Sequence, residues 1–197
     1  MWCAQGVPTT NRARTADRLL TVAERLLLQS GYDALSLRAV NAAAGMNPAA
    51  VHYHFGSKEA LVAALLEKRL GPMWEEPLAE LTTPATVAEL VEVVIAPLTR
   101  LARTPAGRIR LHLLARFVLG RRAPAFTSTW FTLRPWVALL RAARPDLTEQ
   151  DAHHRWILAF ALILQSFGDP LTEVPDGTPM VPADALTTFV VAGLDAS

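Results

Sequence analysis

The sequence predicts an all-α protein, with a small helix-turn-helix domain at the N-terminus and a larger helical domain after it. Apolar residues make up 51% of the 197 residues, and they recur at helical spacing through most of the chain. Glycine and proline lie mainly between these periodic segments, which favours helices over short strands joined by turns. Two short helical segments separated by a glycine turn in the first third of the chain predict the helix-turn-helix.

Charge and composition restrict the class of protein. The net charge is +1, but residues 1–70 carry eight Lys and Arg against five Asp and Glu, whereas residues 71–197 carry eleven against thirteen. A basic N-terminal segment suits contact with a polyanion. The single cysteine, Cys3, allows no internal disulfide and no zinc pattern. The first residues lack the pattern of a signal peptide, and no uncharged run reaches the roughly 18 residues of a membrane span. We therefore expect a cytoplasmic protein.

The first helix follows a leader without periodicity. Residues 1–11 are expected to form a mobile leader, and the helix to begin near Thr15. Gly31 is expected to end it in a left-handed conformation.

The second and third helices are short and closely spaced. Ser36 is expected to cap a helix over Leu37–Ala44 by accepting from its free backbone N–H groups, and Gly45 ends this helix. Asn47 then caps a third helix, Pro48–Tyr53, because proline fits a first helical position where no N–H is needed. Such a third helix has the size to enter the major groove of DNA.

Further helices are predicted from caps and periodicity. Ser57 is expected to cap a fourth helix that reaches Leu70 and stops at Gly71-Pro72, and Pro97 is expected to kink or divide a later one. The later helices are expected at about 77–81, 86–103, 106–120, 124–143, 148–167 and 183–194.

Residues 36–62, SLRAVNAAAGMNPAAVHYHFGSKEALV, resemble the N-terminal domain of the TetR family of transcriptional regulators. The resemblance covers about residues 12–70, and YHFGSKEAL is its most specific part. The family usually has tyrosine two positions before the histidine of this motif, where this chain has His52. The resemblance implies a helix-turn-helix DNA-binding domain over 12–56, a connecting helix over 57–70, and an effector-binding and dimerisation domain over 71–197.

The resemblance and the chemistry of DNA together give a set of expected DNA contacts. Lys58 lies in the first turn of a helix, where its ammonium and the free N–H groups both favour a phosphate. Small side chains on the third helix suit thymine methyl groups, and His52 suits a purine edge. The alternatives are a simple cap for Ser36, helix-forming filler for the alanines, a buried structural role for His54, and a disordered arm for the first two arginines. The expected contacts are Arg12, Arg14, Ser36, Arg38, Asn47, Pro48, Ala49, Ala50, His52, Tyr53, His54 and Lys58.

The stretch Trp156–Phe167 is apolar nearly all round, so one neighbouring face cannot bury it. In the TetR family the last two long helices of each subunit pack into a four-helix dimer interface. The resemblance thus implies a homodimer through about 149–167 and 183–194, with two recognition helices one DNA turn apart. A central helix inside a monomer is the alternative.

Aromatic residues and arginines are interspersed in the C-terminal part, which suits a pocket with apolar walls and a few polar groups. Core filling is the alternative role for each aromatic residue. A small apolar or aromatic effector with an acidic group is expected, bound by Trp130, Phe131 and Arg134 on one helix and by neighbouring residues. The expected ligand contacts are His112, Arg116, Phe117, Phe126, Trp130, Phe131, Arg134 and Trp156.

No cofactor and no metal are expected. His153 and His154 are adjacent, and adjacent side chains on a helix point about 100° apart, which disfavours a shared ion. The chain has no glycine-rich phosphate loop, GxSxG turn or metal-spaced His/Glu pair, which disfavours an enzyme. The expected function is a dimeric repressor that binds an inverted-repeat operator and is released by an effector. The alternatives are an activator of the same fold and a ligand-binding helical protein without DNA binding.

Overall fold

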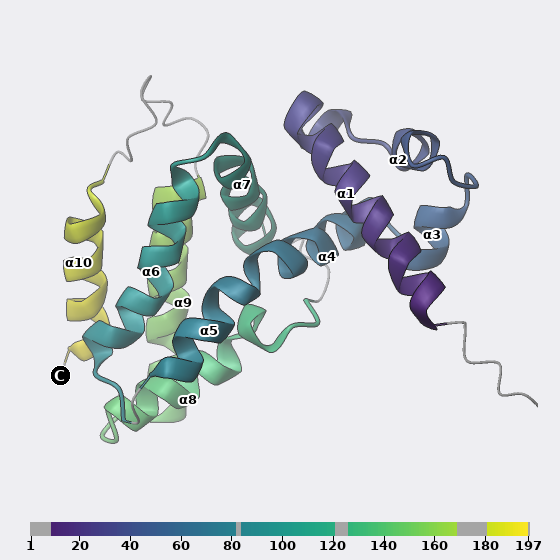
Figure 1. Cartoon of the computed structure of the whole chain (residues 1–197). Coiled ribbons are helices and arrows are strands. Elements are labelled where there is room, and N and C mark those ends of the chain that lie inside the picture. The colour runs from purple at the N-terminus through teal and green to yellow at the C-terminus, as the bar shows by residue number, and fades with distance from the viewer. Residues whose placement is uncertain (1–8, 82–83, 121–125, 169–180, 197) are drawn as a thin grey trace, which may run out of the picture. The chain divides into compact units, whose positions relative to one another are not determined.

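The computed structural model describes residues 9–81, 84–120, 126–168 and 181–196 (Figure 1). Every regular element in these ranges is a helix, which confirms the predicted all-α fold. The chain divides into two compact units, Met1–Leu65 and Leu66–Ser197.

The N-terminal unit contains α1 (Thr9–Ala34), α2 (Leu37–Ala43), α3 (Ala50–Phe55) and the first part of α4 (Lys58–Leu70). Helix α2 packs against both α1 and α3, as Figure 1 shows. The core of this unit is built from aliphatic side chains on all four helices and at the ends of α1 and α2: Leu19, Leu20, Ala23, Leu27, Leu35, Val40, Ala44, Val51, Leu61, Val62 and Leu65.

The first helix begins earlier than predicted. Helix α1 starts at Thr9, so residues 9–11 of the expected leader are helical, while residues 1–8 lie outside the described residues. No glycine or proline separates Thr9 from Thr15, which lets the helix extend beyond its first apolar residue. Gly31 interrupts α1 with a φ of +76° and a ψ of 176°, so φ is positive as predicted, but the conformation is not the left-handed helical one and α1 continues to Ala34.

Helix α3 begins two residues later than predicted. The Asn47 Oδ1 accepts from the backbone N–H of Ala49 at 2.9 Å and holds a turn, and the helix starts only at Ala50. It ends at Phe55, before Gly56, whose φ of +80° glycine tolerates best.

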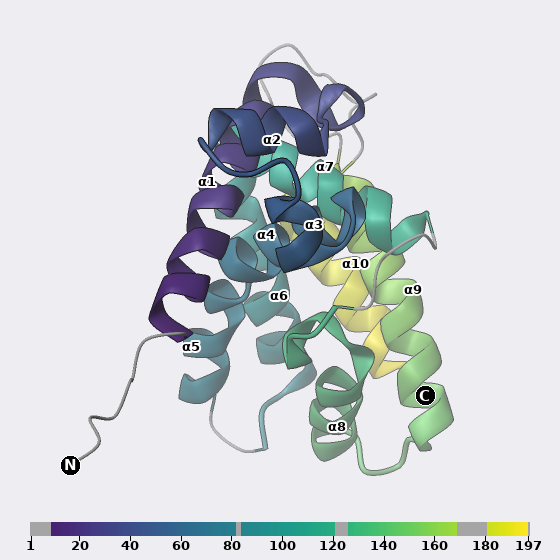
Figure 2. The ribbon, with the colours of Figure 1, turned by 90° about the vertical axis from the view of Figure 1, so that its right-hand side faces the viewer.

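The C-terminal unit is a bundle around α9. Helix α9 packs against α6, α7, α8 and α10 (Figure 1), and in Figure 2 it lies at the edge of the bundle. At Gly168 an added Cβ would lie 2.2 Å from the Ala115 Cβ, so α7 and α9 approach too closely for a side chain there. The elements after α4 are α5 (Pro72–Glu80), α6 (Val87–Ala102), α7 (Pro105–Leu119), the 3-10 turn η1 (Thr129–Phe131), α8 (Leu133–Ala143), α9 (Glu149–Gly168) and α10 (Ala183–Asp195).

Prolines account for most of the differences from the predicted boundaries. Helix α4 ends at Leu70, as predicted, but Gly71 has helical dihedrals and α5 begins directly at Pro72, earlier than the helix predicted after Pro77. Proline is compatible with a helix start because its missing N–H has no partner there. Pro77 lies inside α5, and Pro97 lies inside α6 without dividing it.

The helix predicted over 124–143 is shorter in the structure. Residues 121–125 lie outside the described residues, and α8 begins only at Leu133. Thr132 has extended dihedrals and separates α8 from η1. Trp130 and Phe131 therefore lie on η1, and the prediction that they share a helix with Arg134 is wrong.

The start of α6 gives a pH-dependent prediction. The Thr86 Oγ1 accepts from the Glu89 backbone N–H at 3.2 Å, and the Glu89 Oε2 accepts from the Thr86 N–H at 2.7 Å. This bond to the Thr86 backbone is the main cause that lowers the pKa of Glu89 below its ordinary value of 4.5. A lowered pKa in the folded state gives stability that is present above pH 4.5 and is lost as the pH falls through the folded pKa.

Glu89→Gln is therefore expected to be less stable than the wild type at neutral pH, with a difference that shrinks as the pH falls below 4.5 and through the lowered pKa of Glu89. Urea unfolding at a series of pH values measures this. Glu92→Gln, at an exposed position on the same helix, is the control and should leave the pH profile unchanged. A constant difference between Glu89→Gln and wild type at all pH values would contradict the expectation.

Candidate nucleic-acid interface and ligand cavity

A buried asparagine holds α3 against α2. The Asn41 side chain is 2% exposed and is the one buried polar side chain in the described part of the chain. Its Nδ2 donates to the Pro48 carbonyl oxygen at 2.6 Å, and its Oδ1 accepts from the Val51 N–H at 3.0 Å. One amide thus satisfies a carbonyl and an N–H group at the start of α3. Asn41 is not among the predicted site residues, and its sequence signal is a polar residue on the apolar face that also contains Val40 and Ala44.

The turn between the two helices requires a glycine. Gly45 has a φ of +64°, in the left-handed region that other residues rarely adopt. Its N–H donates to the Ala42 carbonyl oxygen at 3.0 Å, and the Met46 N–H donates to that of Asn41 at 2.9 Å. The turn fixes the direction in which α3 leaves α2.

The expected DNA contacts are largely accessible. Tyr53 is 70% exposed, and Ser36 caps α2 by accepting from the Ala39 N–H at 3.1 Å. Three of the expected contacts are half-buried: Ala50, His54 and Lys58. The exposed ones are Arg12, Arg14, Ser36, Arg38, Asn47, Pro48, Ala49, His52 and Tyr53.

Two cations of this unit lie on tyrosine rings. The Arg12 guanidinium lies 5.5 Å from the centroid of the Tyr53 ring, so the structure brings α1 to the exposed face of α3. Arg12 and Arg14 belong to α1 and not to a flexible arm. The Lys58 Nζ lies 4.3 Å from the Tyr32 ring centroid and 3.4 Å from the Asp33 carbonyl oxygen.

Tyr32 also anchors the start of α4. Its hydroxyl donates to the Glu59 Oε1 at 3.1 Å. The pKa of Glu59 lies below its ordinary value, first because its carboxylate accepts from its own backbone N–H and then because Tyr32 and Ser57 donate to it. The last turn of α1 is thereby tied to the first turn of α4, where Lys58 lies.

The C-terminal unit contains a cavity of about 390 Å³ with apolar walls. Of the expected ligand contacts, Trp130 and Phe131 line it. The described residues that line the cavity are Trp74, Leu98, Leu114, Val118, Leu119, Trp130, Phe131, Thr132, Leu133, Trp136, Ile157, Phe160, Ala161 and Leu164.

Three tryptophans of the lining, Trp74, Trp130 and Trp136, cluster together with Trp156, which lies behind them in the core. The Trp136 ring centroid lies 5.8 Å from that of Trp130, 5.6 Å from that of Trp156 and 6.4 Å from that of Trp74. The Trp136 Nε1 donates to the Trp130 carbonyl oxygen at 3.0 Å, and the Trp156 Nε1 donates to that of Trp136 at 2.8 Å. These two bonds fix the ring planes.

The other expected ligand contacts lie outside the lining. Trp156 and Phe117 are buried in the core, and Phe126 packs on Phe131 with 4.9 Å between ring centroids. The His112 Nδ1 hydrogen-bonds the Gly168 carbonyl oxygen at 2.9 Å. Both arginines of the expected set, Arg116 and Arg134, are exposed and do not line the cavity.

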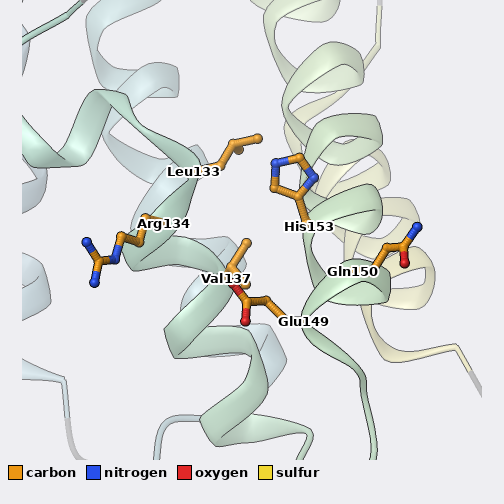
Figure 3. A pocket seen from close by; sticks show the side chains of 6 residues that line it. All are labelled: Leu133, Arg134, Val137, Glu149, Gln150 and His153. Atoms are coloured by element: carbon orange, nitrogen blue, oxygen red, sulfur yellow. The ribbon is translucent and has the colours of Figure 1, made fainter.

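A second, open groove of about 760 Å³ lies between α8 and α9 (Figure 3). Leu133 and His153 point toward each other across it, whereas Arg134 points away from α9. The residues that the structure describes contain no group of three or more His, Cys, Asp or Glu side chains that could hold a metal ion.

A carboxylate ties α4 to the segment that leads to η1. The Glu67 Oε1 accepts from the backbone N–H groups of Thr127 and Ser128, the latter at 2.7 Å, and the Oε2 accepts from the Thr127 hydroxyl at 2.8 Å. Ser128 directly precedes η1, which carries Trp130 and Phe131 of the cavity wall. Glu67 is not among the predicted site residues.

Helices α9 and α10 expose large apolar side chains. Leu158 on α9 is 70% exposed and Phe189 on α10 is 68% exposed. The two helices pack against each other within the unit. None of the described helices has both the length and the apolar character needed to cross a membrane.

Residues 19–65 match the family described as bacterial regulatory proteins, tetR family. The HTH-type transcriptional regulator BetI of Rhizobium meliloti (strain 1021) is 32% identical over 77 residues, which cover 39% of this chain. This match spans only 38% of the relative's own length.

Solved structures resemble more of the chain. The multidrug binding protein EbrR, crystallised with imidazole, has a TM-score of 0.61 and 22% identity, over 92% of this chain and 90% of that one. Salmonella enterica GusR has a TM-score of 0.63 and 22% identity, over 93% of this chain and 96% of that one. At this identity the two likenesses establish the fold alone, an N-terminal helix-turn-helix followed by a helical bundle, as predicted.

Proposed function

Because residues 19–65 make this chain a member of the TetR family, we propose that it is a DNA-binding transcriptional repressor that works as a homodimer and responds to a small molecule. The observation that carries this proposal is the geometry of the helix-turn-helix. Asn41 and Gly45 hold a short helix whose outer face is exposed, beside the basic residues of α1 and the start of α4.

In this proposal α3 enters the major groove. Pro48 and Ala49, which directly precede α3, and His52 on it are exposed and small enough, or polar enough, to meet base edges. Arg38 and Lys58 contact phosphates on either side, and the N–H groups at the starts of α2 and α4 add to this. Phosphate contacts position the protein, whereas the few groups on α3 specify the sequence.

The homodimer is supported by the exposed apolar face of α9 and α10. Leu158 and Phe189 leave most of their surface in water in the single chain, and a second copy would bury them. A two-fold dimer presents two copies of α3 to an inverted repeat, which matches the symmetry of such operators.

The effector role is supported by the cavity and by the bonds of Glu67. A volume of about 390 Å³ is in the range of small-molecule sites, and the walls are apolar. A ligand that moves η1 would also move the segment that Glu67 holds, and α4 with it. Such a ligand acts only if it binds the DNA-free form more tightly than the DNA-bound form. The similar EbrR structure is that of a multidrug binding protein complexed with imidazole, which supports a small-molecule role for this fold.

DNA binding is tested by selecting bound sequences from a random duplex library and then measuring affinity by fluorescence anisotropy at several salt concentrations. We expect an inverted repeat and an affinity that falls steeply with salt, because bound phosphates release counterions. Arg38→Ala is expected to weaken binding to all sequences alike and to lower the salt slope by about 1 per subunit.

Arg100→Ala is the matched control, since Arg100 is exposed on α6 in the other unit. It removes the same charge and should leave the salt slope unchanged. A purified dimer that selects no inverted repeat would overturn the proposal.

A further inference from the structure

Trp74, which lines the cavity, has an indole N–H group that is buried without a hydrogen-bond partner among the described residues. Trp74 is 5% exposed, and its Nε1 is buried without a hydrogen-bond acceptor in the part of the chain that the structure describes. The indole N–H groups of Trp136 and Trp156, in the same cluster, both have backbone acceptors. A buried N–H without an acceptor costs free energy, so an acceptor that reaches it is favoured.

The rings around Trp74 do not replace that acceptor. The Phe131 ring centroid lies 5.6 Å from that of Trp74 at 75°, and the Trp136 centroid lies 6.4 Å away at 87°. An aromatic face accepts from an N–H group only weakly. Trp74 belongs to the cavity lining, so a molecule bound in the cavity lies next to its indole ring.

The walls also select against charge. Among the described residues the lining has no ionisable side chain, and Thr132 is its one hydroxyl. Arg116 and Arg134 lie elsewhere, so an anion in the cavity would lose its hydration without a counter-ion. The rings of Trp130, Phe131 and Phe160 offer faces and edges to a flat aromatic molecule.

We propose that the cavity binds an uncharged, flat aromatic molecule with a single hydrogen-bond acceptor, and that the Trp74 Nε1–H donates to this acceptor. The inference rests on the proposed function only for the effect of the ligand on DNA binding. It replaces the acidic effector that the sequence predicts with a neutral one, because the structure places both arginines outside the lining.

Three probes with the same bicyclic frame test the ligand class: naphthalene, quinoline and 2-naphthoate. Quinoline adds a neutral ring nitrogen that accepts a hydrogen bond, and 2-naphthoate adds a negative charge. Equilibrium dialysis against the purified protein without DNA gives the three dissociation constants. We expect quinoline to bind about fivefold to tenfold more tightly than naphthalene, which is the usual net effect of one hydrogen bond, and 2-naphthoate to bind most weakly. Equal or tighter binding of naphthalene or 2-naphthoate, or binding of none of the three, overturns the inference.

Two variants identify the donor. Trp74→Phe keeps an aromatic ring but removes the N–H, and it should abolish the preference for quinoline while naphthalene still binds. Thr132→Val removes the other polar group of the lining and should keep the preference. The reverse pattern identifies the Thr132 hydroxyl as the donor and overturns the role of Trp74. Should Trp74→Phe fail to fold in a thermal melt, a quinoline preference that persists in Thr132→Val supports the inference, and one that disappears overturns it.

The DNA assay separates this inference from the proposed function. If the preference for quinoline depends on Trp74 but the protein binds no DNA, the result supports the proposed ligand class and overturns the proposed regulator function. If the protein binds an operator but does not prefer quinoline, the result supports the proposed regulator function and overturns the proposed ligand class.

Discussion

If the protein is the proposed homodimer, the double variant Leu158→Arg/Phe189→Arg is expected to be a monomer and to bind the proposed inverted-repeat operator about 10²- to 10⁴-fold more weakly, the usual range for losing a linked second site. Each side chain appears twice in a two-fold interface, so the double variant places four charges in it. Burial of one large apolar side chain contributes roughly 1.5–3 kcal/mol, and this contribution is lost at each position. Without the dimer, each subunit binds one half of the operator alone.

Sedimentation velocity gives the oligomeric state, and anisotropy with full and half operators gives the two affinities. The monomeric variant should bind both DNAs with the same weak affinity, because each offers it only single half-sites. Leu28→Arg is the control, since Leu28 is 42% exposed on α1 in the other unit. A double variant that sediments as a dimer would place the interface elsewhere.

Asn41→Leu is expected to destabilise the N-terminal unit by about 2–5 kcal/mol and to abolish operator binding. Leucine has nearly the size of asparagine, but it leaves the Pro48 carbonyl oxygen and the Val51 N–H buried without their partner. Both groups belong to the start of α3, so the loss falls on the helix proposed to read the DNA.

Hydrogen exchange followed by mass spectrometry measures the two units separately. Peptides from residues 34–56 should lose protection in Asn41→Leu, whereas those from α7 and α9 should not. Asn47→Ala is the matched control, because Asn47 is an exposed asparagine with one bond to the Ala49 N–H, and its loss should cost only about 1 kcal/mol. Equal effects of the two substitutions would argue against the role of Asn41.

Features that depend on neighbours in the sequence could be predicted. Ser36, Ser57, Thr86 and Thr148 all cap the helices assigned to them, because a cap needs only a hydroxyl and an N–H three residues later. The positive φ of Gly31 follows equally from local chemistry. Prolines were less informative, since α4 ends at Leu70 as predicted, but Pro72 also begins the next helix, which the sequence placed only after Pro77.

Features that depend on distant residues could not be predicted. Glu67 meets Thr127, and no local pattern relates two positions so far apart in the chain. The unpartnered Trp74 N–H has no signature in the sequence, since it arises only when the rings pack. The expected set of ligand contacts mixes arginines with aromatic residues, because composition alone does not tell which side chains turn inward.

Helix α4 runs without a break from the core of the N-terminal unit, where Leu61 is buried, to Glu67 at the segment before the cavity wall. If this helix couples the two ligands, the coupling free energy is mutual, and DNA must weaken the binding of the effector by the same factor by which the effector weakens the binding of DNA. The effector concentration needed to clear a promoter then rises with the affinity of its operator. The proposed repressor would in this way release weak operators at low effector concentration and strong operators at high concentration. The affinities of the operators would then set the order in which the genes are induced.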